Sequence, residues 1–283
     1  MRFLSYNIQY GLGSDGRYDL ERIAGEIEGA DVIALQEVDR FWQRSGNVDS
    51  PRVLAALLKG YYWVYGANLD MHAATPEDPG RRRQFGTMLL SRTPILSSRN
   101  FMLPKWGTLS QHSIQQGMLE GVVETGSGAV RVCSVHLSHL CPETRLPQIA
   151  RIKEILAAAH GEGGAWCGGH PDPSAGWTEG DMPPMPREVI VMGDLNLTPA
   201  SVEYSALIGP WTEKYGRIAH RDGLVDSWTA AGHDEREGIT HPNGSRIDYI
   251  LVGAMLAGRV RAAGVMSDAT GSDHWPVWAE IDV

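Results

Sequence analysis

The segment Val189–Asn196, which reads Val-Ile-Val-Met-Gly-Asp-Leu-Asn, constrains the fold most strongly. Its run of β-branched and apolar residues predicts a buried strand. Gly193 marks a position where the strand can bend or where another backbone can approach closely. If the extended conformation continues beyond it, Asp194 and Asn196 point to the same side. The segment therefore predicts a polar site at a strand end, although a strand followed by an ordinary polar turn also explains these residues.

Similar arrangements recur along the chain. Four further apolar runs carry a polar side chain at or near one end: Arg2–Asn7, Val32–Glu37, Val130–His136 and Arg246–Val252. A buried carboxylate is costly unless it is paired. We therefore expect a metal or a rim salt bridge at Glu37, and a cationic or imidazole partner for Asp248. A lone histidine such as His136 is more often structural, and it becomes a candidate only through its neighbours.

The remaining patterns indicate mixed sheets covered by helices, in a single domain of residues 1–283. Apolar spacing and cap residues predict four helices: Asp19–Glu28, Pro51–Leu58, Arg145–His160 and Ala200–Leu207. Strands Met118–Val123 and Val130–Val135 should form a hairpin across the glycine-containing segment between them. Arg246–Val252 and Val277–Val283 are predicted strands, and Gly209–Arg221 is a predicted loop.

Two polar segments stand apart from these elements. Residues 161–187 are rich in glycine and proline and predict a loop insertion, whose tryptophan and methionine side chains either pack onto the body or cover a substrate or lipid surface. His72–Arg83 is a second predicted loop, and it ends in three consecutive arginines. That run is either a solvated face or a device that steers phosphate towards a nearby site.

Charge and cysteine content exclude some classes of protein. The formal net charge of −9 and pI of about 5.6 argue against a protein that grips long duplex DNA, which normally displays a basic surface. Three cysteines do not make a disulfide framework in 283 residues. No window has the length and apolarity of a membrane span, and the N-terminus does not resemble a signal peptide. We expect a cytoplasmic protein without stable membrane insertion, and no protein partner is implied.

Taken together, the strand-end residues resemble the endonuclease/exonuclease/phosphatase superfamily, the group with a DNase I-like fold. Six motifs occur in family order: Ser5-Tyr6-Asn7-Ile8, Leu35-Gln36-Glu37-Val38, Val135-His136-Leu137, Gly193-Asp194-Leu195-Asn196, Arg246-Ile247-Asp248-Tyr249 and Ser272-Asp273-His274. The resemblance spans nearly the whole chain. It implies an α/β fold in which two mixed β-sheets pack face to face with helices outside, a four-layer α/β/β/α sandwich with the active site at one rim.

The resemblance also implies a metal site and a water-activating residue. Glu37 is the main expected ligand, helped by Asn7, while Asp273 contributes directly or through water. Hard oxygen ligands suit Mg²⁺ or Mn²⁺. Asp194 is expected to orient or deprotonate the attacking water. His274 would lie beside the phosphorus, and either of these two groups could act as the base.

Other residues are expected to hold the phosphate. Asn196 binds a phosphoryl oxygen, Asp248 keeps His274 cationic, and His136 contacts the phosphate or helps the leaving group. Bacterial relatives often carry an asparagine near Gly86-Thr87-Met88 and an arginine near Gln115-Gln116, and this chain has neither. One phosphate contact is therefore missing or is supplied by Arg83 or His139.

The sequence thus predicts a divalent-metal-dependent hydrolase that cleaves a phosphoester, expected to be a phosphodiester of a small molecule or lipid head group. Cleavage would proceed by in-line attack of an activated water. A nuclease of the same fold acting on DNA or RNA is the alternative. A non-catalytic binding module that keeps the sandwich as a scaffold is a third hypothesis.

Overall fold

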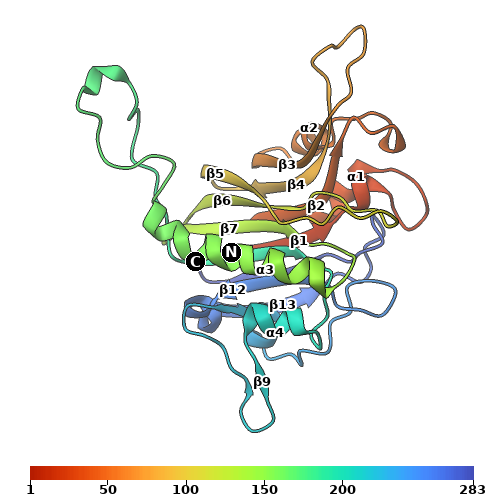
Figure 1. Cartoon of the computed structure of the whole chain (residues 1–283), viewed down its shortest axis with the longest axis vertical. Coiled ribbons are helices and arrows are strands. Elements are labelled where there is room, and N and C mark those ends of the chain that lie inside the picture. Colours follow the sequence, from red (N-terminus) through yellow and green to blue (C-terminus); the bar gives the residue numbers. More distant parts are fainter.

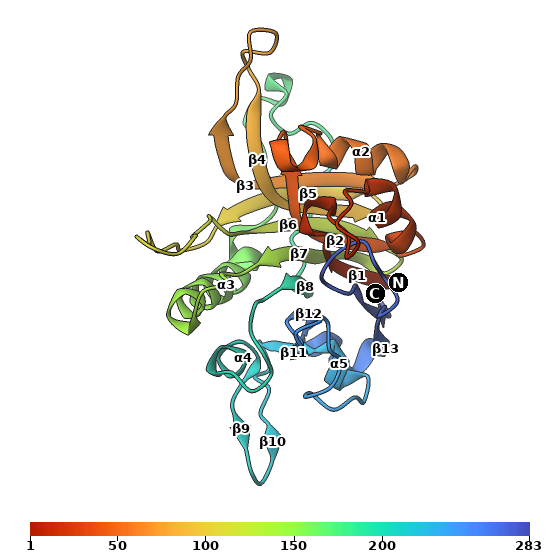
Figure 2. The ribbon, with the colours of Figure 1, turned by 90° about the vertical axis from the view of Figure 1, so that its right-hand side faces the viewer.

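The computed structural model describes all 283 residues and consists of two six-stranded β-sheets packed face to face, with helices on both outer faces (Figures 1 and 2). The four-layer α/β sandwich expected from the sequence is confirmed. No helix combines the length and the apolar character that crossing a bilayer requires.

The first sheet contains the N-terminal and C-terminal strands of the chain. Its order is β13 (Val260–Val265), β14 (Val277–Ile281), β1 (Arg2–Asn7), β2 (Val32–Arg40), β4 (Arg82–Ser91) and β3 (Tyr62–His72). Only β1 and β2 run parallel, and every other pair in this sheet is antiparallel.

The second sheet repeats this arrangement with a central parallel pair. Its order is β11 (Leu224–Asp226), β12 (Asp248–Gly253), β8 (Val189–Asp194), β7 (Gly128–His136), β6 (Gly117–Thr125) and β5 (Ile95–Met102). Here β7 and β8 are the parallel pair, and all other pairs are antiparallel. The hairpin predicted across residues 124–129 is confirmed by the pairing of β6 with β7.

Helices cover the outer face of each sheet because each sheet is apolar on both sides. The first sheet is covered by α1 (Leu20–Ile27) and α2 (Ser50–Leu57), and the second by α3 (Pro142–Glu162) and α4 (Val202–Ile208). The side chain of Asp19 accepts from the backbone N–H of Arg22 and caps α1. Alternation along β1 sends Phe3 between the sheets and Leu4 and Tyr6 towards α1.

Short elements complete the chain: α5 (Ser227–Ala230) and four 3₁₀ turns, η1 (Gln9–Gly11), η2 (Gln43–Ser45), η3 (Pro173–Ala175) and η4 (Ala254–Arg259). A small separate hairpin joins β9 (Trp211–Thr212) to β10 (Gly216–Arg217) and projects below α4 in Figure 2. The expectation of a plain loop over Gly209–Arg221 was therefore wrong.

Several other strand and loop boundaries in the structure also differ from those predicted from the sequence. The predicted loop His72–Arg83 shrinks to residues 73–81, because β3 continues to His72 and β4 begins at Arg82. These two strands pair with each other as far as His72 and Arg82. This pairing extends them into polar residues that show only a weak apolar pattern in the sequence. Strand β12 begins at Asp248, two residues later than expected, and β5 and β13 had no strong sequence signal.

The segment 161–187 starts with the last two residues of α3 and is otherwise irregular apart from η3. Figure 1 shows it projecting from the body, and Trp177 is 76% exposed, so this tryptophan does not pin the loop. The segment enters β8 at Val189, whereas Asp194 lies at the other end of that strand. It therefore does not cover the edge that carries Asp194.

Candidate active site

The predicted site residues converge because of strand direction. In each central parallel pair the two carboxyl ends lie at the same edge, which places Asn7 beside the Glu37 region of β2 and His136 opposite Asp194. Strand β12 is antiparallel to β8 and therefore begins at that edge, with Asp248 opposite Asp194. Strand β14 is likewise antiparallel to β1, so the preceding Asp273-His274 also arrives there.

Asn7 lies at the centre of this cluster. Its side-chain Nδ2 donates to Glu37 Oε1 at 3.2 Å and to Asp194 Oδ2 at 3.0 Å, and it lies 3.5 Å from His274 Nε2. His136 Nε2 lies 3.6 Å from Asp194 Oδ2 and 4.0 Å from Glu37 Oε1. One amide from the first sheet therefore connects groups from both sheets and from the segment before β14.

His274 forms a buried pair with Asp248. Its Nδ1 lies 2.9 Å from Asp248 Oδ2, and its Nε2 lies 3.8 Å from Asp194 Oδ2. Burial alone would lower the pKa of His274, but the nearby carboxylates, Asp248 first among them, raise that pKa to about 10. Burial raises the pKa of the Asp248 carboxyl, and the facing imidazole opposes this effect. At neutral pH His274 is therefore an imidazolium with Nε2 directed towards the cluster.

Glu37 reaches the edge through a β-bulge. The pairing of β2 with β4 shifts register between Leu35 and Val38, and Glu37 has a left-handed φ of 55°. Gln36 turns between the sheets, where its Nε2 donates to Ser134 Oγ at 3.0 Å. Glu37 stays 23% exposed at the rim. The strand thus continues to Arg40 instead of ending at Glu37, and the bulge redirects one side chain to the site.

Gly193 allows a close approach that a side chain would prevent. A Cβ at this residue would lie 1.8 Å from the carbonyl oxygen of Val135 in the paired strand β7, so the expectation of a close backbone approach is confirmed. Immediately afterwards, Asp194 Oδ1 accepts from the backbone N–H of Asn196 at 2.9 Å.

The extended conformation does not continue beyond Asp194, so the condition under which Asp194 and Asn196 would point to the same side is not met. Strand β8 ends at Asp194, and Asn196 has a left-handed φ of 51°. The turn is closed by the Asp194 side chain, a role that short acidic residues often fill. Asn196 Nδ2 donates to the carbonyl of Leu137 at 3.1 Å, which leaves its second amide N–H without a protein acceptor.

Asp273 occupies the outer rim of the cluster. Its Oδ2 accepts from Gln9 Nε2 at 2.9 Å, and its side chain is 41% exposed. Gln9 in turn donates its backbone N–H to Asn7 Oδ1 at 3.0 Å. His241 was missed by sequence reasoning: its Nε2 lies 3.9 Å from Asp273 Oδ2 and its ring packs edge-on against His274. No apolar strand precedes His241, so the strand-end signal could not identify it.

The two residues expected to replace a phosphate contact make no hydrogen bond to the cluster, although His139 lies near enough that partial burial and the neighbouring His136 lower its pKa while Glu37 and Asp194 oppose this. Arg83 donates Nε to the carbonyl of Phe41 at 3.3 Å and lies over the Trp42 ring. His139 is exposed and stacks on His112, with ring centroids 6.5 Å apart. Neither side chain bonds to Asn7, Glu37, Asp194 or His274.

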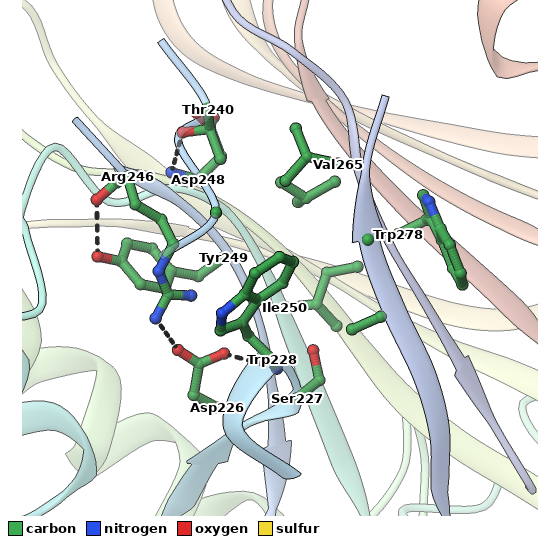
Figure 3. A pocket seen from close by; sticks show the side chains of 14 residues that line it. Asp226, Ser227, Trp228, Thr240, Arg246, Asp248, Tyr249, Ile250, Val265 and Trp278 are labelled. Atoms are coloured by element: carbon green, nitrogen blue, oxygen red, sulfur yellow. Dashed lines mark hydrogen bonds and ion pairs between the residues drawn. The ribbon is translucent and has the colours of Figure 1, made fainter. Parts of the chain in front are cut away.

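A small cavity lies behind Asp248 and does not have the size of a substrate site. It measures about 20 Å³, which is room for a single water-sized molecule. Figure 3 shows Arg246, Asp226 and Trp228 in its wall, with Arg246 Nη2 bonded to Asp226 Oδ2 at 2.6 Å. This cavity therefore does not hold a substrate, whereas Glu37 and Asp273 are partly exposed at the rim.

The donor set fits a hard divalent cation. Glu37 and Asp273 have carboxylate oxygens at the rim, the amide oxygen of Asn7 also accepts from the Gln9 backbone N–H, and cysteine is absent from the cluster. Three ligand atoms from Asp194, Asp248 and His274 lie within 4.8 Å of one another, as do three from His241, Asp273 and His274. Glu37 belongs to neither of these two groups of ligand atoms. Both groups contain His274. As an imidazolium, His274 already offsets part of the negative charge of the carboxylates in each group.

Comparison with known proteins finds a family match for the sequence and similar folds among solved structures. The family model described as "Endonuclease/Exonuclease/phosphatase family" matches residues 4–274. A 40-residue segment, 14% of the chain, is 48% identical to DNA-(apurinic or apyrimidinic site) endonuclease 2 of Saccharomyces cerevisiae, of which it spans only 8%.

Two solved structures share the fold over the whole chain. A mannosyl-6-phosphatase from Bacteroides thetaiotaomicron VPI-5482 is 18% identical with a TM-score of 0.67, and the match covers 100% of both chains. An endonuclease/exonuclease/phosphatase from Beutenbergia cavernae DSM 12333 is 21% identical with a TM-score of 0.64, covering 99% of this chain and 70% of that one. At these identities the likeness concerns the fold.

Proposed function

The chain belongs to the endonuclease/exonuclease/phosphatase family, and we propose that it is a divalent-metal-dependent hydrolase that cleaves a phosphodiester of a small molecule or lipid head group. Phosphoesterase-type hydrolysis is the activity class that the family match supports. The observation that carries the proposal is the convergence of Glu37, Asp194 and His274 around Asn7, with all three Nδ2 distances at or below 3.5 Å.

Phosphoester cleavage requires neutralisation of phosphoryl charge and an attacking water aligned with the leaving oxygen. Glu37, Asn7 and Asp273 would hold Mg²⁺ or Mn²⁺, which supplies charge neutralisation when bound. Asp194 is fixed by two hydrogen bonds, one from Asn7 and one from the Asn196 backbone, and would orient the water and accept its proton.

His274 is assigned a charge-stabilising role. Because its pKa is raised to about 10, it is already protonated at neutral pH and cannot act as the base in that state. Its Nε2–H would donate to a phosphoryl oxygen, while Asp248 fixes the ring through Nδ1. With His274 in this role, we propose Asp194 as the base.

Asn196 and His136 would complete the phosphate contacts. The Asn196 amide has one N–H free to donate to a phosphoryl oxygen after bonding Leu137. His136 lies 3.6 Å from Asp194 and would contact either the phosphate or the leaving group.

A nuclease of the same fold is the second candidate, and the 40-residue match to a yeast abasic-site endonuclease favours it. The formal charge of −9 favours the small-molecule or lipid substrate instead, because duplex binding depends on phosphate neutralisation by basic residues.

The test is a panel of phosphomonoesters, bis-p-nitrophenyl phosphate, phospholipids and nucleic acids, each assayed with Mg²⁺ and with Mn²⁺. We expect metal-dependent hydrolysis of bis-p-nitrophenyl phosphate. Asp194→Asn should lower this rate by about 10²–10⁴-fold, the usual contribution of a positioned acid–base group. Asp222→Asn, an exposed change, is the control. Full activity of folded Asp194→Asn would refute the mechanism, and efficient nicking of plasmid at low protein concentration would favour the nuclease.

A further inference from the structure

The loop that follows β2 builds a cation–aromatic cluster next to the candidate active site. The Arg44 guanidinium lies over three rings, at 3.9 Å from the centroid of Tyr10, 4.5 Å from Trp42 and 5.5 Å from Phe85. Below, the Arg44 platform means Arg44 with these three aromatic residues. Such stacking favours arginine over lysine because the guanidinium is planar and weakly hydrated.

The platform is held in a defined geometry. Trp42 Nε1 donates to the carbonyl of Gln84 at 2.8 Å, which fixes the indole. Arg44 Nε donates to Asp39 Oδ2 at 3.2 Å, and Asp39 is a fully buried carboxylate that also accepts from Ser45 Oγ. A buried carboxylate without these partners would be costly, so Asp39 and Arg44 stabilise each other's position.

The platform is connected to the active-site rim through η1. Gln9 donates to Asp273 Oδ2, and the next residue, Tyr10, packs its ring on Arg44. Tyr10 also has a left-handed φ of 49°, so the chain turns sharply between the rim and the platform. Two consecutive residues, Gln9 and Tyr10, therefore link the rim to Arg44.

Arg44 retains unused hydrogen-bond donors. Only its Nε has a protein partner, both terminal nitrogens lack one, and the side chain is 35% exposed. Arg83 lies over the same Trp42 ring at 5.6 Å, and neither Arg83 nor Arg81 has a carboxylate within 4.0 Å. The two terminal nitrogens of a fixed guanidinium can donate two parallel hydrogen bonds to a phosphate group. The neighbouring arginines make this part of an acidic protein locally basic.

We infer that the Arg44 platform is a subsite for a second phosphate group of the substrate, beside the phosphoester that is cleaved. The substrate class is then a phosphoester that carries a further phosphate, and Arg83 strengthens the local positive potential without contacting the reacting group. This inference rests on the proposed function, because it assigns the cleaved phosphoester to the cluster around Asn7.

The experiment compares two probes that differ by one phosphate. Glucose 1-phosphate and glucose 1,6-bisphosphate are tested as competitive inhibitors of bis-p-nitrophenyl phosphate hydrolysis at equal free Mg²⁺. In the wild type the bisphosphate should inhibit at a concentration at least tenfold lower. Arg44→Ala should reduce this ratio to below threefold. Arg44→Lys should leave an intermediate ratio, because a lysine ammonium keeps the positive charge but lacks the paired N–H donors of a guanidinium.

Arg82→Ala is the matched control. Arg82 is the arginine next to Arg83, and it pairs with Asp70 on the exposed hairpin, so its loss should leave the ratio unchanged. Thermal unfolding of each variant checks that the loss of Asp39's partner has not unfolded the protein. Arg44→Lys keeps a cation there if Arg44→Ala fails to fold.

A wild-type ratio near one, or a ratio that both Arg44 variants leave intact, would overturn the subsite. If the wild type does not hydrolyse bis-p-nitrophenyl phosphate at all, the proposed function fails instead. In that event calorimetric titration with the same two sugar phosphates still measures the ratio, so the two failures are distinguishable.

Discussion

His274 links the electrostatics of the site to its protonation state. Its folded-state pKa of about 10 lies above the ordinary value of 6.5, because the pull of Asp248 and Asp194 exceeds the effect of burial. The charged ring therefore stabilises the fold fully below pH 6.5, and this contribution is lost as pH rises from 6.5 to about 10.

We accordingly predict that His274 in metal-free protein remains protonated at pH 8. The measurement is a pH titration of the imidazole nitrogens by ¹H–¹⁵N NMR. In Asp248→Asn the pKa should fall, since the 2.9 Å carboxylate partner is replaced by a neutral amide. Titration of wild-type His274 near pH 6.5 would contradict the role given to Asp248.

Some residues of the site were predictable and others were not. Asn7, Asp194 and His136 each end an apolar strand, and that pattern is visible in the sequence. His241 comes from a segment without such a pattern, and it joins the site only because the chain folds back against His274. Arg44 was likewise invisible, because two of the rings it stacks on, Tyr10 and Phe85, are distant in sequence and give no local signal.

At the scale of the element, the end of each strand decides where its side chain points. The bulge in β2 turns Gln36 between the sheets and Glu37 to the rim. The left-handed turn after β8 moves Asn196 off the strand axis. Hydrophobic periodicity reports where a buried strand runs but contains no information on a one-residue bulge, so strand identity was predictable while these two orientations were not.

Gly193 gives a prediction for the pairing of β7 with β8. Gly193→Ala should lower the free energy of unfolding by at least about 2 kcal/mol, because the new Cβ would overlap the Val135 carbonyl and force the central strands apart. Urea unfolding measures the change. Gly25→Ala is the control: it lies in α1 with no neighbour within 4 Å of the added Cβ, and it should stabilise by up to about 1 kcal/mol.

A Gly193→Ala variant as stable as the wild type would show that β7 and β8 can separate at no cost. The close approach at this position would then not be what sets the distance between His136 and Asp194.

At the scale of the whole molecule, the sandwich brings together residues that are far apart in the chain. Two sheets each contain one central parallel pair flanked by antiparallel neighbours, and the strand ends of both sheets meet at one edge. Asn7 and His274 are 267 positions apart and 3.5 Å apart in space. The segment 161–187 enters from the opposite end of β8, so shortening it should leave the edge intact.

We therefore predict that replacing residues 166–184 with a short glycine–serine linker changes the rate of bis-p-nitrophenyl phosphate hydrolysis by less than about threefold. The physical reason is that this segment contributes no residue to the cluster, and loop length has a small effect on stability. Steady-state kinetics with thermal unfolding as a check on folding gives the answer. A loss of more than tenfold in a folded variant would mean that the segment contacts substrate.

The most direct test of the central claim is turnover of bis-p-nitrophenyl phosphate by metal-stripped protein as Mn²⁺ is added, with wild type, Glu37→Ala and the exposed control Glu77→Ala side by side. We predict no turnover before metal is added, a saturable rise in wild type and Glu77→Ala, and at least about a 100-fold lower rate in Glu37→Ala. Turnover by the stripped wild type, or equal activation of Glu37→Ala, would contradict a metal-dependent phosphoesterase site at this edge.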